Sequence, residues 1–430
     1  MQETRAPKAK QRAVLVAVLE RGDDLAELEE LLRTAGVATV GKVVQHRDKP
    51  HPNTYLGTGR LQQLKDEVKR LDANVVAVDD ELSPRQERNL EQALEVAVID
   101  RTAIILDIFA RHAATAEGKL QVELAQLQYN MARMRGLWTH LERLGAGRMD
   151  GGIGTRGPGE SQIETDRRLA RDRISALKRR LEEVKGSRET MRAERSRAHL
   201  PQVALAGYTN AGKSTLLNQM TGATVGVRDR LFHTLDPTIR QLQLNGRTYL
   251  LTDTVGFIRK LPHQLVDAFG ATLEETRLAD LILHVVDASQ PEEELDAMLE
   301  AVDDVLEEIG AGARPRILVL NKADLLDDER RRELGFRHPD GVLVSGVTGE
   351  GLGELGERIE GEFEKALRPI ELLLPFSEGG RLAELHGVAG DLEREDTTEG
   401  VRVRARVTAT VAERFARYAV SANGAGRDGG

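Results

Sequence analysis

The first hundred residues alternate between short β-rich apolar runs and stretches with helical spacing. The β-rich runs are Ala13–Leu19, Ala38–Val44, Val75–Val78 and Val96–Ile99. The helical stretches between them are Asp24–Thr34, Gly59–Leu71 and Pro84–Leu94. Strands that alternate with helices are typical of parallel sheets, so this part predicts a small parallel α/β domain. Prolines and glycines in Lys49–Gly59 predict a surface loop, and we favour a turn there over a phosphate contact.

From Arg101 to Met149 the pattern becomes helical. One apolar face carries Ile104, Ile105, Ile108 and Phe109, and a second carries Leu120, Leu124, Leu127, Met131 and Met134. Two apolar faces at helical spacing predict a helical hairpin. A glycine-rich segment, Asp150–Ser161, then predicts irregular structure. One long polar helix is expected over Ile163–His199.

A second α/β pattern occupies residues 201–367, after an N-terminal region of residues 13–200. Its β-rich runs are Val203–Ala206, Ile239–Leu244, Thr248–Leu251, Leu281–Val286, Arg316–Leu320 and Val342–Val344. Asn245-Gly246 joins two of these runs and is a strong hairpin signal. The pattern predicts a mostly parallel sheet with its ligand at the carboxyl ends of the strands.

The last part of the chain predicts a small α+β domain over residues 368–422. Two strands are expected at Ile370–Pro375 and Val401–Val407, and a helix at Gly380–His386. The polar residues 1–12 and the Gly-rich residues 423–430 predict a flexible lead and a disordered tail.

Composition narrows the class of protein. The 430 residues contain no cysteine, which excludes disulfides and Cys-based zinc sites and is compatible with the cytoplasm. No apolar run approaches the roughly 18 residues of a membrane span, and the basic N-terminus lacks the apolar region of a secretory signal. A net charge of −9 argues against a uniform coat of nucleic acid but leaves room for a local basic surface.

The segment GYTNAGKS, Gly207–Ser214, lies between an apolar run and a helical stretch, which is the context of a phosphate-binding loop. Glycines let backbone N–H groups approach a polyphosphate at a helix N-terminus. Lys213 can reach the outer phosphates, and the Ser214 hydroxyl can bind Mg²⁺. The candidate nucleotide contacts here are Gly207, Tyr208, Thr209, Asn210, Ala211, Gly212, Lys213, Ser214 and Thr215.

Three further motifs follow in the order of a guanine-nucleotide site. The first, with Asp253, Thr254, Val255 and Gly256, can hold Mg²⁺ through water and sense a γ-phosphate. The second contains Asn321, Lys322 and Asp324, and its acceptor-only carboxylate suits the N1–H and N2 donors of guanine, whereas adenine offers no such pair. The third, Ser345, Gly346 and Val347, can close over guanine O6. Together they predict a GTP site.

A switch segment is expected between the phosphate loop and Asp253, in Phe232–Thr238. Such a segment offers a hydroxyl to Mg²⁺ in the triphosphate state and releases it after hydrolysis. The spacing alone leaves Thr234 and Thr238 as equal candidates. The nucleotide-contact candidates in this segment are Phe232, His233, Thr234, Leu235 and Asp236.

The segment before the second α/β pattern carries a local positive charge. Between Asp166 and His199 there are twelve Lys or Arg and six Asp or Glu, a balance of +6. A solvated helix with internal ion pairs is the simpler interpretation, but the excess charge beside a glycine-rich loop favours contact with RNA phosphates. By composition alone the glycine-rich loop itself is a linker.

On the basis of these motifs, we find that the chain resembles the HflX family of GTPases over nearly its whole length. The resemblance rests on the segments Tyr55–Arg60, Glu81–Glu91, Asp100–Ala110, Glu117–Tyr129, Gly151–Arg168, Gly207–Asn218, Phe232–Thr238 and Asp253–Ile258. It implies a Ras-like G domain after an N-terminal α/β and hairpin domain. It also implies binding to the large (50S) ribosomal subunit and a role in ribosome splitting, rescue or subunit maturation.

The resemblance also assigns roles to single residues. It places the switch threonine for Mg²⁺ at Thr234 and changes the glycine-rich segment from a linker to an RNA-contacting loop. The RNA-contact candidates are Gly151, Gly152, Gly154, Arg156, Gly157 and Gly159. Asn210 resembles the asparagine of potassium-activated GTPases, and a turn cap is an equal alternative. His233 and Gly346 depart from the usual small residue and alanine.

Two points concern mechanism and alternatives. Phe257 stands where many small GTPases carry a water-orienting glutamine, so we expect slow intrinsic hydrolysis that depends on a ribosomal partner, unless the ring lies outside the site. The alternative function is an RNA-remodelling enzyme with a second nucleotide site in the N-terminal domain, although no second phosphate-loop motif precedes Gly207. Asp324 argues against a metabolic P-loop kinase. A monomer is the default expectation.

Overall fold

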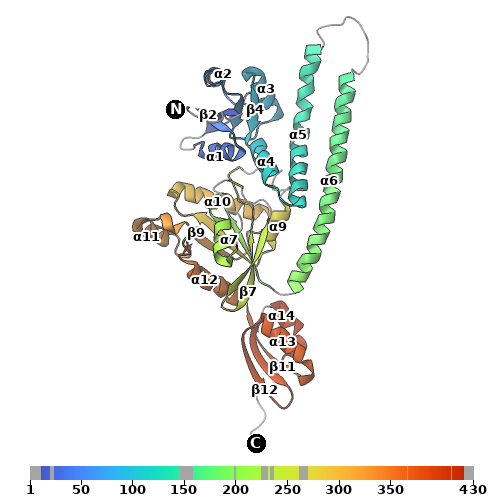
Figure 1. Cartoon of the computed structure of the whole chain (residues 1–430), viewed down its shortest axis with the longest axis vertical. Helices are drawn as coiled ribbons and strands as arrows, with labels where there is room; N and C mark the ends of the chain where they lie inside the picture. The colour runs from blue at the N-terminus through green and yellow to red at the C-terminus, as the bar shows by residue number, and fades with distance from the viewer. Residues whose placement is uncertain are drawn as a thin grey trace, which may run out of the picture.

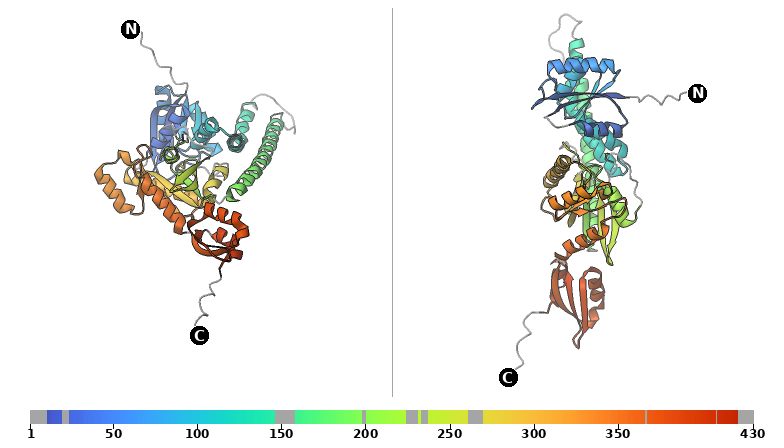
Figure 2. Two further views of the ribbon diagram at one scale, coloured as in Figure 1. Left: turned by 60° about the horizontal axis from the view of Figure 1, so that its bottom comes forward. Right: turned by 90° about the vertical axis from the view of Figure 1, so that its left-hand side faces the viewer.

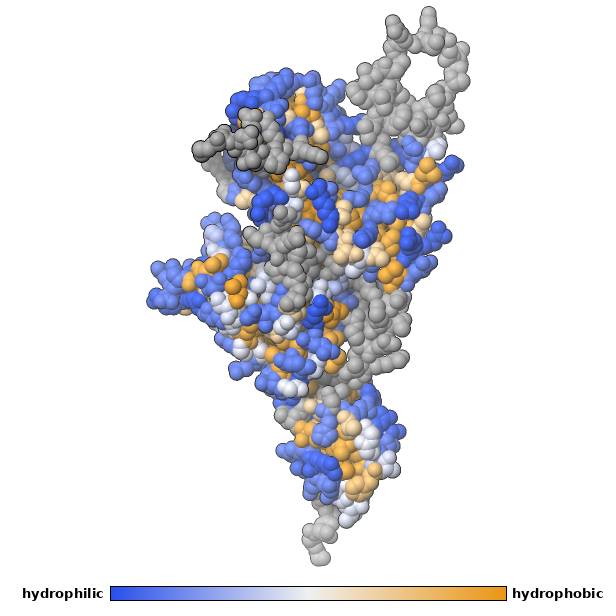
Figure 3. Space-filling view, in the orientation of Figure 1, coloured by the Kyte–Doolittle hydropathy of each residue, from blue (hydrophilic) through white to orange (hydrophobic). Residues whose placement is uncertain are grey.

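The computed structural model describes residues 11–19, 24–145, 158–197, 200–223, 231–232, 237–260, 270–365, 367–407 and 409–420. Three sheets follow one another along the long axis of the molecule, and a pair of long helices runs beside the first two (Figures 1 and 2). Most of the face visible in Figure 3 is hydrophilic, with smaller apolar areas over the long helices and the C-terminal sheet. None of the described helices is long and apolar enough to cross a membrane.

The N-terminal sheet is parallel, with the order β2-β1-β3-β4. Its elements in chain order are β1 (Arg12–Leu19), α1 (Ala26–Ala35), β2 (Ala38–His46), α2 (Thr58–Arg70), β3 (Val75–Val78), α3 (Pro84–Leu94) and β4 (Ala97–Asp100). Every residue from Ala13 to Leu19 is buried, because helices cover both faces of the central strand. Ser83 and Gln86 form a capping box at the start of α3.

The prediction that Lys49–Gly59 forms a surface loop is wrong in part. Tyr55 is 1% exposed, and its hydroxyl accepts the N–H of Val18 at 3.0 Å and donates to Asp80. The loop therefore anchors itself in the domain core through one aromatic side chain. Gly57 caps the N-terminus of α2, as expected for a turn.

The two helices predicted within Arg101–Met149 exist as α4 (Arg101–His112) and α5 (Ala116–Gly145), and they contact each other. Helix α4 also packs against α1, and α5 makes a more extensive contact with α6 (Pro158–Arg197), which was not predicted. The apolar contact between α5 and α6 is made by Leu120, Leu124 and Leu177. Helix α6 begins at Pro158, inside the segment predicted to be irregular, because proline is well suited to a first helical turn.

The second sheet has the order β10-β9-β8-β5-β7-β6, and only β6 is antiparallel. Its strands are β5 (Gln202–Gly207), β6 (Thr238–Leu244), β7 (Arg247–Asp253), β8 (Leu281–Asp287), β9 (Arg316–Asn321) and β10 (Val342–Leu343). The helices around it are α7 (Lys213–Thr221), α9 (Gly270–Leu278), α10 (Glu292–Glu308), α11 (Asp328–Arg337) and α12 (Leu352–Lys365). Asn245 and Gly246 have positive φ, 43° and 82°, as the predicted two-residue hairpin requires.

The C-terminal unit is an antiparallel sheet, β11-β13-β12, covered on one face by helices. Its elements are β11 (Arg368–Leu374), α13 (Gly379–Val388), β12 (Gly390–Asp396), β13 (Val401–Val407) and α14 (Ala409–Arg414). Strand β12 and helix α14 were not predicted. In β13, Val401, Val403, Ala405 and Val407 point into the core and alternate with arginines. The predicted flexible lead and the predicted tail lie almost wholly outside the described residues.

Candidate nucleotide-binding site

The predicted phosphate loop connects the carboxyl end of β5 to the N-terminus of α7. Two of its glycines are required by their surroundings. A Cβ at Gly207 would lie 2.1 Å from the Val285 carbonyl oxygen, and one at Gly212, with φ of 89°, would lie 2.3 Å from Asn321 Nδ2. The loop therefore lies in close contact with β8 and β9. Asn210 has a φ of 61°, a left-handed conformation that asparagine tolerates in turns.

Lys213 lies in the first turn of α7, and only 6% of the residue is exposed. Its Nζ donates to the carbonyl oxygens of Gly207 at 2.9 Å and Tyr208 at 2.7 Å. Burial lowers the pKa of Lys213 to about 8, and the nearby Asp253 carboxylate opposes that shift. The phosphate loop thus holds a buried ammonium group that an anion can compensate.

Ser214 and Asp253 provide the oxygen pair expected for a magnesium site. The Ser214 hydroxyl donates to Asp253 Oδ2 at 2.5 Å, and Asp253 is fully buried at the end of β7. A hydroxyl and a carboxylate side by side at a phosphate loop fit Mg²⁺, which takes oxygen ligands and keeps some of its waters. These two side chains are the ones that would hold the ion, beside the phosphates.

The residues predicted to bind the base meet at the ends of β9 and β10. Asn321 Nδ2 donates to the Ala211 carbonyl at 2.8 Å, and its Oδ1 accepts the Gly346 N–H at 3.0 Å. The Ser345 hydroxyl donates to Asp324 Oδ1 at 2.6 Å, which orients the carboxylate. Lys322, in a left-handed conformation with φ of 66°, reaches Asp287 Oδ2 at 2.7 Å. Val347 is 71% exposed beside them.

The segment after Asp253 runs directly along the phosphate loop. Thr254 donates from its hydroxyl to the Leu205 carbonyl at 2.7 Å, and Val255 is buried. A Cβ at Gly256 would lie 2.9 Å from Thr209 Cα and 3.1 Å from Lys213 Nζ. Only glycine allows this close approach of the segment to the loop.

Phe257 is fully buried, and its backbone pairs with the phosphate loop: its N–H donates to Gly207 O at 3.0 Å, and its carbonyl accepts the Thr209 N–H at 2.7 Å. The ring belongs to the apolar core and thus lies outside the site, the second of the two possibilities that the sequence left open.

The switch candidates are only partly described. His233, Thr234, Leu235 and Asp236 lie outside the described residues. Thr238 is the first residue of β6. Phe232 is 2% exposed, and its ring packs edge-on against Phe109 of α4. Its side chain therefore serves the contact with the N-terminal domain. Of the RNA-contact candidates, Gly159 is in α6, and the other five lie outside the described residues.

Sequence reasoning missed a polar cluster that joins the site to the N-terminal domain. Arg101, whose side chain is 3% exposed, pairs with Glu27 and with Asp79 at 2.8 Å. Glu27 also accepts the hydroxyl of Tyr208 in the phosphate loop. The available signal was the charged pair Asp100-Arg101 between two apolar runs, which would be costly to bury without partners.

The parallel sheet, the phosphate loop and the three motifs at its strand ends define a P-loop GTPase domain. Three family models match the chain: a GTP-binding GTPase N-terminal region at residues 22–110, a GTP-binding GTPase middle region at 112–195, and a 50S ribosome-binding GTPase domain at 202–322.

Curated relatives give the family its name. The chain is 48% identical over 421 residues to GTPase HflX of Lacrimispora saccharolytica, covering 96% of each chain. It is 46% identical over 407 residues to GTPase HflX of Escherichia coli, covering 92% of this chain and 94% of that protein. The chain belongs to the HflX family and hydrolyses GTP. A GTP-binding protein of Sulfolobus solfataricus, solved with GDP, is 26% identical with a TM-score of 0.42, and the match covers 82% of this chain and 98% of that one.

Proposed function

We propose that this GTPase binds the large ribosomal subunit in its GTP state, in the cytoplasm, and acts in ribosome splitting, rescue or subunit biogenesis. The description of the matching G-domain family as 50S ribosome-binding supports the partner. The observation that carries the proposal is a row of cations on the outer face of α6.

That row consists of Arg168, Arg171 and Lys178, all exposed. Their spacing places them on one side of the helix, with Ser175 between them. None of the three has an ion pair within the described part of the chain, whereas Arg173 on another side pairs with Glu123 of α5 at 2.6 Å. Cations that are not held in ion pairs can neutralise phosphates and release the counterions bound there, which favours binding to RNA.

We propose that Gly151, Gly152, Gly154, Arg156, Gly157 and Gly159, at the connection between α5 and α6, contact ribosomal RNA. The described helix ends that flank them, the C-terminus of α5 and the N-terminus of α6, lie away from the G domain (Figure 1). A glycine-rich backbone at that position can approach RNA more closely than a loop with bulky side chains.

At the nucleotide, Ser214, Asp253 and Thr234 are proposed to hold Mg²⁺, which neutralises charge on the phosphates. Lys213 and the loop N–H groups orient the triphosphate, and Asp324 selects guanine. Water attacks the γ-phosphorus, the bond to the β-phosphate oxygen breaks, and GDP and phosphate are released. The Phe257 ring lies in the apolar core and takes no part in orienting that water, so slow intrinsic hydrolysis that depends on the ribosomal partner stays a prediction. Potassium activation through Asn210 stays a prediction, and equal turnover in K⁺ and Na⁺ buffers would exclude it.

The alternative, a second nucleotide site in the N-terminal domain, has little electrostatic support. The carboxyl edge of its sheet carries Asp79, Asp80 and Asp100, which repel a polyphosphate. ATP turnover that survives Lys213→Ala would nevertheless establish such a site.

Co-sedimentation with purified 50S and 70S particles tests the proposal, with GDP or a non-hydrolysable GTP analogue, and with GTP turnover measured in parallel. We expect binding in the triphosphate state and faster hydrolysis, and splitting of 70S particles would select the rescue role. Exchange of Arg168, Arg171 and Lys178 for glutamine is expected to weaken binding and its salt dependence. The matched control exchanges Arg240, Arg332 and Arg358, which are exposed arginines of the G domain. Nucleotide-independent binding, or equal effects of both triple variants, would contradict the proposal.

A further inference from the structure

The carboxyl edge of the N-terminal sheet carries a group of charged side chains. In open parallel sheets, ligands bind outside the carboxyl ends of the strands, where the strand order reverses. In the order β2-β1-β3-β4 that position lies between β1 and β3. Asp79 and Asp80 directly follow β3, and Arg101 directly follows β4. The edge is therefore acidic, with one buried arginine.

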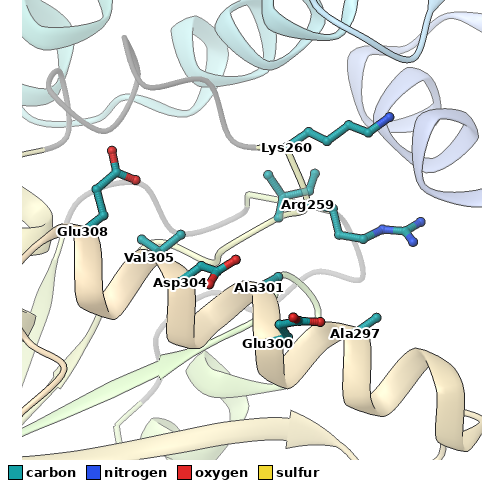
Figure 4. Close-up of a pocket in the computed structure, with 9 residues that line it drawn as sticks. Arg259, Lys260, Ala297, Glu300, Ala301, Asp304, Val305 and Glu308 are labelled. Atoms are coloured by element: carbon teal, nitrogen blue, oxygen red, sulfur yellow. The ribbon is translucent and has the colours of Figure 1, made fainter. Parts of the chain in front are cut away.

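Two consecutive cations of the G domain occupy this edge. Lys260 Nζ lies 2.5 Å from Asp80 Oδ1 and 3.6 Å from Asp79 Oδ2. Arg259 Nε lies 3.7 Å from Glu27, and the Arg259 carbonyl accepts from Arg101 Nη2 at 3.0 Å. In Figure 4, the side chains of Arg259 and Lys260 extend to the same side, toward the pale blue ribbons of the N-terminal domain. They come three and four residues after Gly256, in the segment 256–260, which follows the Asp253 motif and is called the second switch segment below.

The phosphate loop takes part in the same contact. The Tyr208 hydroxyl accepts the Arg259 N–H at 2.8 Å and donates to Glu27, which in turn pairs with Arg101. Burial and the neighbouring Glu27 raise the pKa of Tyr208, so the hydroxyl keeps its proton. One loop side chain thus binds both the switch backbone and the N-terminal domain.

A third nucleotide-contact segment reaches the N-terminal domain through an apolar contact. The ring of Phe232, the residue before His233 and Thr234, lies edge-on to Phe109 with centroids 4.6 Å apart and an angle of 78°. Phe232 has a φ of 56°, which is rare for an aromatic residue and is maintained by this buried packing. The N-terminal domain therefore contacts the phosphate loop and both switch segments.

We propose that the carboxyl edge of the N-terminal sheet is the binding site of Arg259 and Lys260. We further propose that this ionic contact depends on whether a γ-phosphate is bound, and so couples the N-terminal domain to the nucleotide state. Gly256 lies against Thr209 and Lys213, the groups between which a γ-phosphate must be accommodated. Entry of that phosphate moves the segment from Gly256 to Lys260 and strains its contact with Asp79 and Asp80. The ionic contact therefore raises the affinity for GDP relative to that for GTP, and binding of GTP weakens the contact.

The segment has room to move on its other side. A groove of about 360 Å³ separates Ile258, Arg259 and Lys260 from the face of α10 that carries Ala297, Ala301 and Val305 (Figure 4). A shift toward α10 meets open space and the carboxylates of Glu300, Asp304 and Glu308, whose charge is opposite to that of the two cations. A shift toward the phosphate loop meets Thr209. The packing thus allows the segment to move away from the N-terminal sheet toward α10.

Lys260→Met in the full-length chain tests this inference. The Lys260 side chain is 52% exposed, so the variant removes one cation without opening a buried cavity. Affinities for fluorescent GDP and for a fluorescent non-hydrolysable GTP analogue are measured without ribosomes. We expect the ratio of GTP-analogue affinity to GDP affinity to rise at least about fivefold, the lower end of usual coupling factors. Tyr208→Phe, which keeps the ring but loses the hydroxyl, is expected to change the ratio in the same direction.

Two controls separate coupling from general destabilisation. Lys260→Arg keeps the charge and is expected to restore most of the wild-type ratio, and Lys365→Met removes a cation of α12 whose side chain is 73% exposed and should leave the ratio unchanged. If Lys260→Met leaves both affinities unchanged, or changes both by the same factor, the inference is overturned. Since the experiment contains no ribosome, its failure would leave the ribosomal proposal untouched.

Discussion

Asn321 and Ala211 are joined by a hydrogen bond of 2.8 Å, from the side-chain amide of one to the carbonyl oxygen of the other. This bond connects the base-recognition motif to the phosphate loop, although the two residues are 110 positions apart. Both halves of the nucleotide site are therefore fixed in one unit before any ligand binds.

Asn321→Asp is expected to weaken binding of GDP and GTP about equally, by a factor of roughly 10 to 100. The substitution places a carboxylate oxygen against the Ala211 carbonyl, and the loss of a buried hydrogen bond costs about 1–3 kcal/mol. Equilibrium titration with fluorescent nucleotides measures the effect. Asn245→Asp, in the exposed β6–β7 turn, serves as the control and should bind both nucleotides normally.

Asp324→Asn is expected to reduce the affinity for guanine nucleotides and raise that for xanthine nucleotides. The carboxylate accepts from the N1–H and N2 groups of guanine, whereas an amide can donate to the oxygen that xanthine carries at position 2. Competition of GDP against XDP gives the ratio. An unchanged preference would mean that Asp324, although oriented by Ser345, does not contact the base.

Nucleotide affinity is expected to fall as the pH rises above about 8. The pKa of Lys213 is lowered to about 8 by burial in the free protein, and bound phosphates stabilise the charged form and raise that pKa. Binding therefore takes up a proton above pH 8 and becomes weaker there. The free protein responds in the opposite direction: the unfolded state binds more protons than the folded state between about pH 8 and the ordinary lysine value near 10.5, so the unfolding free energy rises over that range. Calorimetry in buffers of different ionisation enthalpy measures the proton uptake, and Lys213→Ala should abolish it.

Phe257→Ala is expected to lower the unfolding free energy by about 3–5 kcal/mol, because the ring is fully buried. Phe336→Ala offers a matched control, since Phe336 is 89% exposed on α11 and its loss should change little. Urea unfolding followed by circular dichroism compares the two. Equal stability of both variants would show that the Phe257 ring does not contribute to the core.

Much of the fold could be predicted because local signals agree with the final structure. Val75–Val78 and Pro84–Leu94 have the predicted bounds, since one is a fully buried strand and the other begins with a capping box. The pairing of α5 with α6 was missed because an apolar face shows that a helix is covered but does not identify the element that covers it. Leu177 completes the contact from more than fifty positions beyond Leu124.

The grouping of the candidate nucleotide-site residues could be predicted from the sequence, whereas the contacts around them could not. Its residues lie in short motifs whose chemistry is local, and the structure brings Lys213, Ser214, Asp253 and Asn321 together as expected. The interdomain contact joins Glu27 to Tyr208 across 181 positions, and no short pattern announces such a pairing. Phe232 shows the same limit, because its ring faces the neighbouring domain, although it was predicted from its place beside the switch.

Helix α6 is long enough for a small rotation at one end to produce a large displacement at the other. Its 40 residues correspond to about 60 Å, and one end leads directly into the strand that carries the phosphate loop. Arg133 and Tyr129 of α5 both bind Asp100, at 2.6 and 2.7 Å, which fastens the other arm of the hairpin to the N-terminal sheet. A rotation of about 5° at this base would displace the tip by about 5 Å, roughly the pitch of one helical turn. A rotation too small to disturb the core around the nucleotide would therefore displace the far end of the helix by a distance comparable to the size of a side chain.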